Sequence, residues 1–186
     1  MSLHAERGIV TTKPADIAAR ANVALTTYYK HFPNLDSLVR ACTERGRQRN
    51  PPPDPATIAA LPPGPGARVS MMVETLFRYY ALREPWLFTG RTEVRFVPQL
   101  QQVMAGLAVT RDAFVREALT PAGASPGAVA VTTALVDFWA WHTLRREVGL
   151  TEDEVVRVVV TTIWRVVEIA GPGQGVDGPG QVASPF

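Results

Sequence analysis

The chain has 186 residues, of which 46% are hydrophobic and 19% are charged. This composition excludes a largely disordered protein and leaves enough apolar residues for a sizeable core. The formal net charge of +2 is unevenly distributed, because residues 1–50 carry a net +4 and residues 51–186 a net −2. A basic amino-terminal segment suits a protein that presents one end to a polyanion, although a solvated basic face gives the same count.

We expect neither secretion nor membrane insertion. Cys42 is the single cysteine, which excludes an intrachain disulfide and fits a reducing cytoplasm. The amino terminus has no basic stretch followed by an apolar run, so no signal peptide is predicted. The longest apolar segments, 128–141 and 155–167, are both interrupted by charged residues before they reach the ~20 apolar residues that cross a bilayer. The expected location is the cytoplasm, with no membrane partner.

The first predicted helix spans residues 13–21. Thr12 is a candidate N-cap for it, and Pro14 is tolerated in a first turn. Its apolar face is short and consists of Ile17, Ala18 and Ala21. Because alanines are small, a second helix can pack closely against this face.

A tight turn over 22–24 leads into a second short helix. Asn22 opens the turn, and asparagine is among the non-glycine residues that best tolerate a left-handed conformation. The second helix is predicted over 25–32. Asn34 can cap a third helix over 35–46, whose inner face consists of Leu38, Val39 and Cys42.

Proline then interrupts the chain. Residues 47–66 predict a proline-rich linker, with room for a short helix over 55–61 that Asp54 can cap. From Ala67, apolar residues recur three and four positions apart, which is typical of one helix face. We expect this helix to end just before Pro85, and its apolar residues are Val69, Met72, Val73, Leu76, Tyr79 and Tyr80.

Two more helices are predicted in the carboxy-terminal part. One spans about 128–148 and is closed by Gly149. The other, over 155–170, is rich in β-branched residues, but its apolar side chains fall on one helical face and do not alternate. Thr151 and Glu154 form a capping-box pattern at its start.

These elements suggest a division of the chain into four parts. Residues 1–46 would form a helix-turn-helix domain, and 47–66 the linker. Residues 67–171 would form a helical domain. Residues 172–186 have almost nothing to bury and are expected to be a disordered tail.

The second short helix carries side chains that suit DNA. Two short helices joined by a tight turn are the construction of a DNA-binding helix-turn-helix, in which the second helix protrudes into a major groove. Hydroxyl, phenol, ammonium and imidazole groups can donate to phosphates and base edges, and here they belong to Thr26, Thr27, Tyr29, Lys30 and His31. A solvated helix face is the ordinary alternative. Val23, Tyr28 and Phe32 are predicted to be core.

From Thr12 to Leu38 the chain reads T-x-x-x-D-I-A-x-x-A-x-V-x-x-x-T-x-Y-x-H-F-P-x-x-x-x-L. This pattern resembles the tetracycline-repressor-like (TetR/AcrR) family of transcriptional regulators. The resemblance implies that phosphates are contacted by Thr27, Tyr29 and His31, and that the choice of DNA sequence is biased by Leu25, Thr26 and Lys30. Thr12 and Lys13, at the start of the preceding helix, complete the candidate DNA contacts.

The same resemblance implies an all-α fold. An amino-terminal three-helix domain carries the helix-turn-helix, and a carboxy-terminal helical bundle dimerises through its last two long helices. That bundle holds a pocket for a small-molecule effector. The implied partners are a double-stranded DNA operator, a second copy of the chain and an effector of unknown identity.

The chain departs from the family pattern in several places. Asn22 replaces the usual glycine of the turn, and Ala24 replaces the usual serine N-cap of the recognition helix. Leu35 stands where the family has a lysine, which removes one phosphate contact. Only MSLHAER precedes Gly8, where the family has a full helix, so that helix is largely missing. We expect that this sequence starts late, through a mis-called start or a truncation.

The carboxy-terminal half carries a heavy aromatic load that suits an apolar cavity with a few polar groups. Asp137 and His142 stand out because they interrupt an apolar helix, although a satisfied hydrogen bond or a dimer contact also explains such residues. Single aromatic residues at helical spacing are usually core. The candidate ligand-binding residues are Tyr80, Trp86, Phe88, Arg91, Arg95, Phe138, Trp141 and His142.

Catalysis is not expected. The three histidines are scattered, no glycine-rich phosphate loop or nucleophile motif is present, and no cofactor or metal is predicted. The sequence therefore favours a ligand-responsive DNA-binding regulator, by default a repressor. The alternative is a helical ligand-binding or protein-interaction module whose helix-turn-helix no longer binds DNA specifically, which the departures at Ala24 and Leu35 and the missing first helix favour.

Overall fold

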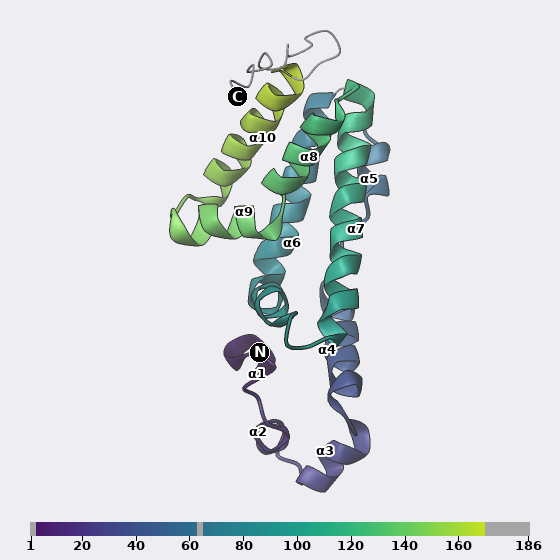
Figure 1. The fold of residues 1–186 in the computed structure, drawn as a ribbon, viewed down its shortest axis with the longest axis vertical. Coiled ribbons are helices and arrows are strands. Elements are labelled where there is room, and N and C mark those ends of the chain that lie inside the picture. Colours follow the sequence, from purple (N-terminus) through teal and green to yellow (C-terminus); the bar gives the residue numbers. More distant parts are fainter. Residues whose placement is uncertain (1–2, 63–64, 170–186) are drawn as a thin grey trace, which may run out of the picture.

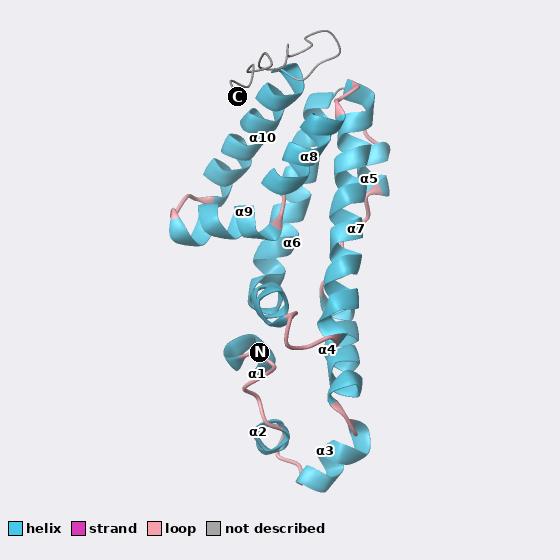
Figure 2. Ribbon diagram, viewed as in Figure 1, coloured by secondary structure: helices cyan, strands magenta, loops and turns pink. Residues whose placement is uncertain are grey.

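The computed structural model describes residues 3–62 and 65–169, and within these ranges every regular element is helical (Figures 1 and 2). The all-α fold expected from the sequence is therefore confirmed. Long helices run side by side along the molecule, and the short amino-terminal helices lie together at one end (Figure 1). In this part of the chain no helix is both long and apolar enough to cross a membrane.

Four helices form the amino-terminal end, and their bounds are α1 (Leu3–Arg7), α2 (Pro14–Arg20), α3 (Leu25–His31) and α4 (Leu35–Arg49). Helix α4 continues past its expected end at residue 46 and reaches the body of the molecule. The short helix α5 (Ala56–Ala59) follows in the proline-rich segment, where the Asp54 carboxylate accepts a hydrogen bond of 2.9 Å from the backbone N–H of Ala56. It is shorter than predicted.

The body consists of α6 (Pro65–Glu93), α7 (Gln99–Leu119), α8 (Pro126–Leu135), α9 (Phe138–His142) and α10 (Glu152–Ile169), with short helical turns over Thr120–Ala122 and Thr143–Glu147. Helix α6 packs against both α7 and α10, and α8 packs against α10 (Figure 1). All six apolar residues predicted for the face of α6 are buried. The core between these helices contains large, fully buried side chains, including Phe77, Phe114, Phe138 and Trp141.

The sequence analysis placed the end of this helix just before Pro85, which is wrong, because α6 continues to Glu93. A proline inside a helix removes one backbone hydrogen bond, which disfavours but does not forbid continuation. Beyond the proline, Leu87 is only 2% exposed, and the Thr89 hydroxyl donates to the carbonyl of Pro85 at 2.9 Å. Tertiary burial of this last stretch therefore outweighs the local signal.

The prediction of a single helix over 128–148 is also wrong. Helix α8 ends at Leu135, and the chain turns before α9, which crosses the direction of α8 (Figure 1). Asp137 causes the break, because its carboxylate accepts a hydrogen bond of 3.0 Å from the backbone N–H of Trp139 and so caps α9. Gly149, with φ of +83°, ends the segment as predicted.

Helix α10 confirms the helical interpretation of the β-branched segment. The Thr151 N–H donates to the Glu154 carboxylate at 2.8 Å and the Glu154 N–H donates to the Thr151 hydroxyl at 3.3 Å, as the capping-box pattern predicts. Val155, rather than Val156, is fully buried on its inner face. Helix α7 had no counterpart among the predicted elements, and the predicted tail lies outside the described residues.

Candidate DNA-binding surface and ligand groove

The turn between α2 and α3 has the geometry of a helix-turn-helix. Asn22 adopts a φ of +52°, the left-handed conformation that its side chain tolerates better than most. The Val23 N–H donates to the carbonyl of Ala18 at 3.0 Å, which closes the turn. Ala24, at the N-cap of α3, has no side-chain acceptor for the first N–H groups, as its identity predicts.

A small core holds α3 against its neighbours. Ala18 from α2, Tyr28 from α3 and Leu38 from α4 are each at most 6% exposed and contact one another. Phe32 packs at the edge of this cluster, with its ring centroid 5.6 Å from that of Tyr28. The small side chain of Ala18 lets α2 and α3 approach closely, and this fixes which face of α3 turns outward.

The outward face of α3 carries the residues that the sequence analysis proposed for DNA. Tyr29 is 49% exposed and Leu25 is 42% exposed, and the remaining candidates on this helix are exposed as well. None of Thr26, Thr27 or Lys30 makes a side-chain hydrogen bond to another described residue, and the same holds for Tyr29 and His31. Their donors are therefore free to meet a partner outside the chain.

Two sequence-based expectations about this region are wrong. Val23, in the turn that follows Asn22, is 43% exposed and is not core. Thr12 does not cap α2, since its hydroxyl donates to the carbonyl of Gly8 at 2.5 Å. Lys13 occupies the N-cap position without a side-chain cap, and its backbone N–H donates to the Asp16 carboxylate at 3.1 Å. Lys13 is exposed, so of these two candidate DNA contacts it has the freer donor.

The start of α4 is capped as predicted. The Asn34 side-chain oxygen accepts a hydrogen bond of 2.9 Å from the backbone N–H of Ser37. Leu35, which stands in the place of a basic residue of the family, is 42% exposed beside it. Arg40 is paired with Asp36 at 2.7 Å, which leaves less of its charge for a phosphate.

The helix-turn-helix is joined to the body at the end of α6. The Glu93 carboxylate accepts hydrogen bonds from the N–H groups of Ile9 at 2.7 Å and Val10 at 3.2 Å. A small apolar cluster lies beside these bonds and consists of Ile9, Val39, Val97 and Leu100. His4 is buried at this junction, and burial lowers its pKa although the charge of Glu93 opposes the effect, so the imidazole stays neutral near pH 7.

The candidate ligand-binding residues of the body do not form one site. Tyr80, Arg91 and Phe138 surround a cavity of about 20 Å³, which has room for little more than a water molecule. Trp141 is core, at 2% exposure. These residues therefore stabilise the bundle more than they offer space.

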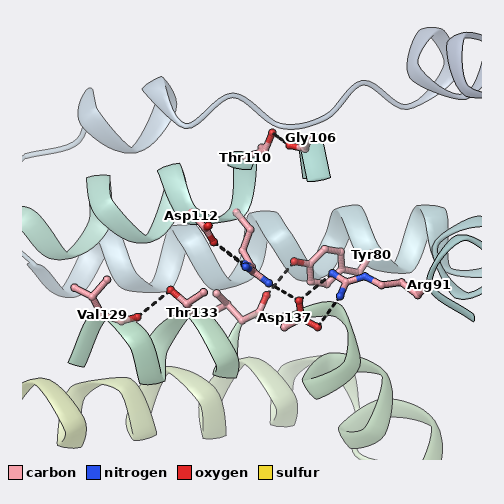
Figure 3. A network of polar contacts seen from close by, with 10 residues as sticks. Tyr80, Arg91, Gly106, Thr110, Asp112, Val129, Thr133 and Asp137 are labelled. Atoms are coloured by element: carbon pink, nitrogen blue, oxygen red, sulfur yellow. Dashed lines mark hydrogen bonds and ion pairs between the residues drawn. The ribbon is translucent and has the colours of Figure 1, made fainter. Parts of the chain in front are cut away.

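Arg91 belongs to a partly buried ionic network (Figure 3). The Asp137 carboxylate lies 2.9 Å from Arg91 and 2.5 Å from Arg111, and Arg111 also contacts Asp112 at 2.8 Å. Burial alone would raise the pKa of Asp137, but the hydrogen bond from Trp139 and the charges of the two arginines together hold it below its ordinary value. Asp137 therefore remains ionised and joins α6, α7 and the break between α8 and α9.

The remaining candidates lie apart from this network. Phe88, Trp139 and His142 form an aromatic cluster in which Phe88 is 42% exposed, and its ring lies 5.2 Å from that of His142. Arg95 is exposed, with its guanidinium 4.6 Å from the ring centroid of Phe96. Among the described residues, no group of three or more His, Cys, Asp or Glu side chains could hold a metal ion.

Trp86 lines a larger groove of about 400 Å³ between α4, α6 and α7. The sequence analysis missed several of its residues, notably Arg83 beside the predicted-core residue Tyr79, as well as Gln102 on the unpredicted helix α7. A signal for Arg83 was present, because it follows Tyr79 by four residues and so continues the buried face of α6.

Comparison with known proteins gives one match. Residues 1–42 match the model of the family described as bacterial regulatory proteins, tetR family. No curated protein and no solved structure matches the chain. The matched segment spans α1 to α3, the turn at Asn22, the first part of α4 and the small core beneath α3. Its sequence pattern and its helix-turn-helix geometry place this segment in the tetR family of bacterial regulatory proteins, a family of DNA-binding transcriptional regulators.

Proposed function

We propose that the chain is a ligand-responsive transcriptional regulator, by default a repressor, that binds a near-palindromic operator as a homodimer. The observation that carries this proposal is the outward face of α3. Its hydroxyl, phenol, ammonium and imidazole groups are exposed and unengaged above a core that fixes the helix. Such a helix fits a major groove, where its donors can reach phosphates and base edges.

The roles of the side chains follow from their chemistry. Thr27, Tyr29 and His31 would donate to phosphates and set the register of the protein on the duplex. Leu25, Thr26 and Lys30 would lie closest to the bases and bias sequence choice. Lys13 and Thr12, at the start of α2, would add contacts to the flanking backbone.

Binding to labelled DNA from the region upstream of the gene, measured across a salt series, tests this proposal. We expect specific binding that weakens steeply with salt, and Lys30→Ala should weaken it and relax its preference for the operator sequence. Arg116→Ala is the matched control, because Arg116 is an exposed cation in the last turn of α7, a helix of the body. A folded protein without specific binding would favour the alternative of a helical module with a degenerate helix-turn-helix.

The homodimer is proposed to form through α8 and α10, which pack against each other and keep apolar residues on their outer faces. Val131 on α8 and Val158 on α10 are each 44% exposed. A charge at either position should weaken a dimer, so we expect Val158→Glu to lower the mass in sedimentation equilibrium toward that of one chain. Val109→Glu on α7, where the valine is 66% exposed, serves as control. An unchanged mass for Val158→Glu would exclude this interface.

Ligand response is proposed to act through the groove between α4, α6 and α7. Thr43 and Arg47 of this groove lie on α4, which also contributes Leu38 to the core beneath α3. A ligand that favours one position of α4 would therefore favour one spacing of the recognition helices in a dimer, and would shift operator affinity by its differential binding.

A further inference from the structure

The groove between α4, α6 and α7 has the size and composition of a site for a small organic molecule. Its volume of about 400 Å³ falls within the range of ligand pockets. One part of its wall is apolar and contains Trp86, Val103 and Leu107. The charged side chains that line it are the guanidinium groups of Arg47 and Arg83, and no carboxylate lines it.

Arg83 is unusual because it is buried and unpartnered. Arg83 is 7% exposed, and its Nε atom is buried without a hydrogen-bond partner. It forms no ion pair with a carboxylate among residues 3–62 and 65–169. Its guanidinium lies 4.7 Å from the ring centroid of Trp86 and rests directly against Gly46 of α4, where any larger residue would displace it. A buried donor with no acceptor is costly.

Two other arginines in the described part of the chain illustrate a purely structural role, because their guanidinium groups have protein partners. Arg68, at 8% exposure, donates hydrogen bonds to the backbone carbonyls of Ala59, Leu61, Pro62 and Glu117. Arg111, which is partly buried, is paired with two aspartates. Arg83 has neither kind of partner, and it lines an open groove rather than a closed core.

Additional groups in the groove complement Arg83. Arg47 is an exposed cation of α4 that forms no ion pair with another described residue. Burial raises the pKa of Tyr79, while the charges of Arg83 and Arg47 oppose the rise, so both guanidinium groups act on this phenol and it stays protonated. The lining therefore provides two positive charges and the hydroxyl donor of Tyr79 beside an apolar wall, whereas the Thr110 hydroxyl already donates to the carbonyl of Gly106 at 3.2 Å.

We propose that the groove binds a small organic oxyanion, a carboxylate or phosphate carried on an apolar body, with the charged group held between Arg83 and Arg47. Guanidinium forks match the oxygens of such groups, and the apolar body would cover Val103 and Leu107. The inference rests on the proposed function in one respect, which is that this anion is the effector. Because Arg47 and Gly46 belong to α4 and Arg83 to α6, the bound anion would join the helix that supports α3 to the body of the molecule.

The test is isothermal titration of the full-length protein with naphthoate, naphthyl phosphate and decanoate, each compared with a neutral analogue such as naphthamide or decanamide. We expect at least one anion to bind about tenfold more tightly than its neutral analogue. Arg83→Met should remove most of this preference and Arg47→Gln part of it. Arg78→Gln, an exposed arginine of α6 that does not line the groove, should have no effect.

Several outcomes would overturn the inference: no anion of the panel binds, the neutral analogues bind equally well, or Arg83→Met retains the preference. Arg83→Met should also fold, since it removes an unpaired buried charge at similar volume, and circular dichroism checks this. If it does not fold, the exposed Arg47 makes Arg47→Gln the deciding variant. Preference retained in Arg47→Gln then counts against the site.

Operator binding is measured separately, without and with the anion that binds best. A shift in operator affinity of about fivefold or more, lost in Arg83→Met, supports the anion as effector. Operator binding without anion binding would overturn the inference and leave the proposed function intact. Anion binding by a protein that does not bind DNA would support the site and overturn the proposed function.

Discussion

The helix-turn-helix and the helical body differ in what they bury. The body encloses several large aromatic side chains, such as Phe114 and Trp141, in a continuous core. The helix-turn-helix has a core of little more than Ala18, Tyr28 and Leu38, and most of α3 is exposed. Because hydrophobic burial is the main stabilising term in folding, the small segment depends on its attachment to the body. Because α3 is mostly exposed, its polar side chains remain free to contact a partner.

Among substitutions that test how the two regions differ, the largest effect is expected at Asp137, which joins three helices of the body. Asp137→Asn should destabilise the fold by about 3 kcal/mol, the lower end for breaking a buried pair, because it leaves Arg91 and Arg111 partly buried without their shared anion. Asp112→Asn is the control, since Asp112 is more exposed. Urea unfolding measures both, and equal effects would show that burial of the pair is unimportant.

The same residue gives a pH dependence. The folded-state pKa of Asp137 is lowered, so its contribution to stability is complete at neutral pH and is lost as the pH falls through the folded-state value, below pH about 4. The stability of the wild type should therefore decline more steeply in acid than that of Asp137→Asn. Parallel curves would contradict this assignment.

A matched pair of buried leucines compares the two regions directly. Leu38 in the small core and Leu119 in the body are 5% and 1% exposed, and each truncation to alanine should cost about 2–5 kcal/mol locally. Leu119→Ala should lower the main thermal transition. Leu38→Ala should instead loosen α3 and remove DNA binding while the main transition changes little. A main transition lowered equally by both variants would mean that the two regions unfold as one unit.

The junction between the regions is weaker. Glu93→Ala removes the acceptor of two backbone N–H groups, those of Ile9 and Val10, and should cost about 1–3 kcal/mol at that point. Hydrogen exchange of these two amides should accelerate, while amides within α10 are unchanged. Glu74→Ala, at an exposed glutamate of α6, controls for the loss of charge. No acceleration would mean that the apolar cluster alone holds the junction.

The smallest expected effect is a gain within the helix-turn-helix. Ala24→Ser supplies a side-chain acceptor at the N-cap of α3 and should stabilise that helix by about 1 kcal/mol. Slower exchange of the first amides of α3 would report it, and Ala24→Gly, which adds no hydroxyl, is the control. If Ala24→Ser has no effect, the first N–H groups of α3 are already satisfied by water.

Local sequence signals determined much of this protein. The helix-turn-helix follows from short-range rules, because Asn22 tolerates a left-handed turn and Asn34 offers a cap. Helix α10 follows from its capping box and from the spacing of its valines. The exposed face of α3 could also be predicted, since Tyr28 lies on the inner side of the helix and the candidate DNA-contact residues lie on its outer side. In each case, residues within a few positions of one another decide the outcome.

Tertiary structure decided the rest, because the deciding partners are far apart in sequence. Helix α6 continues through Pro85 since the stretch beyond it is buried against the body, which outweighs the proline signal. The Asp137 carboxylate also pairs with Arg91 and Arg111, 46 and 26 residues away, and these partners join the break to α6 and α7. The groove at Arg83 exists only because α4 approaches α6 at Gly46. Packing and charge pairing between residues so far apart cannot be predicted from the local spacing of apolar residues.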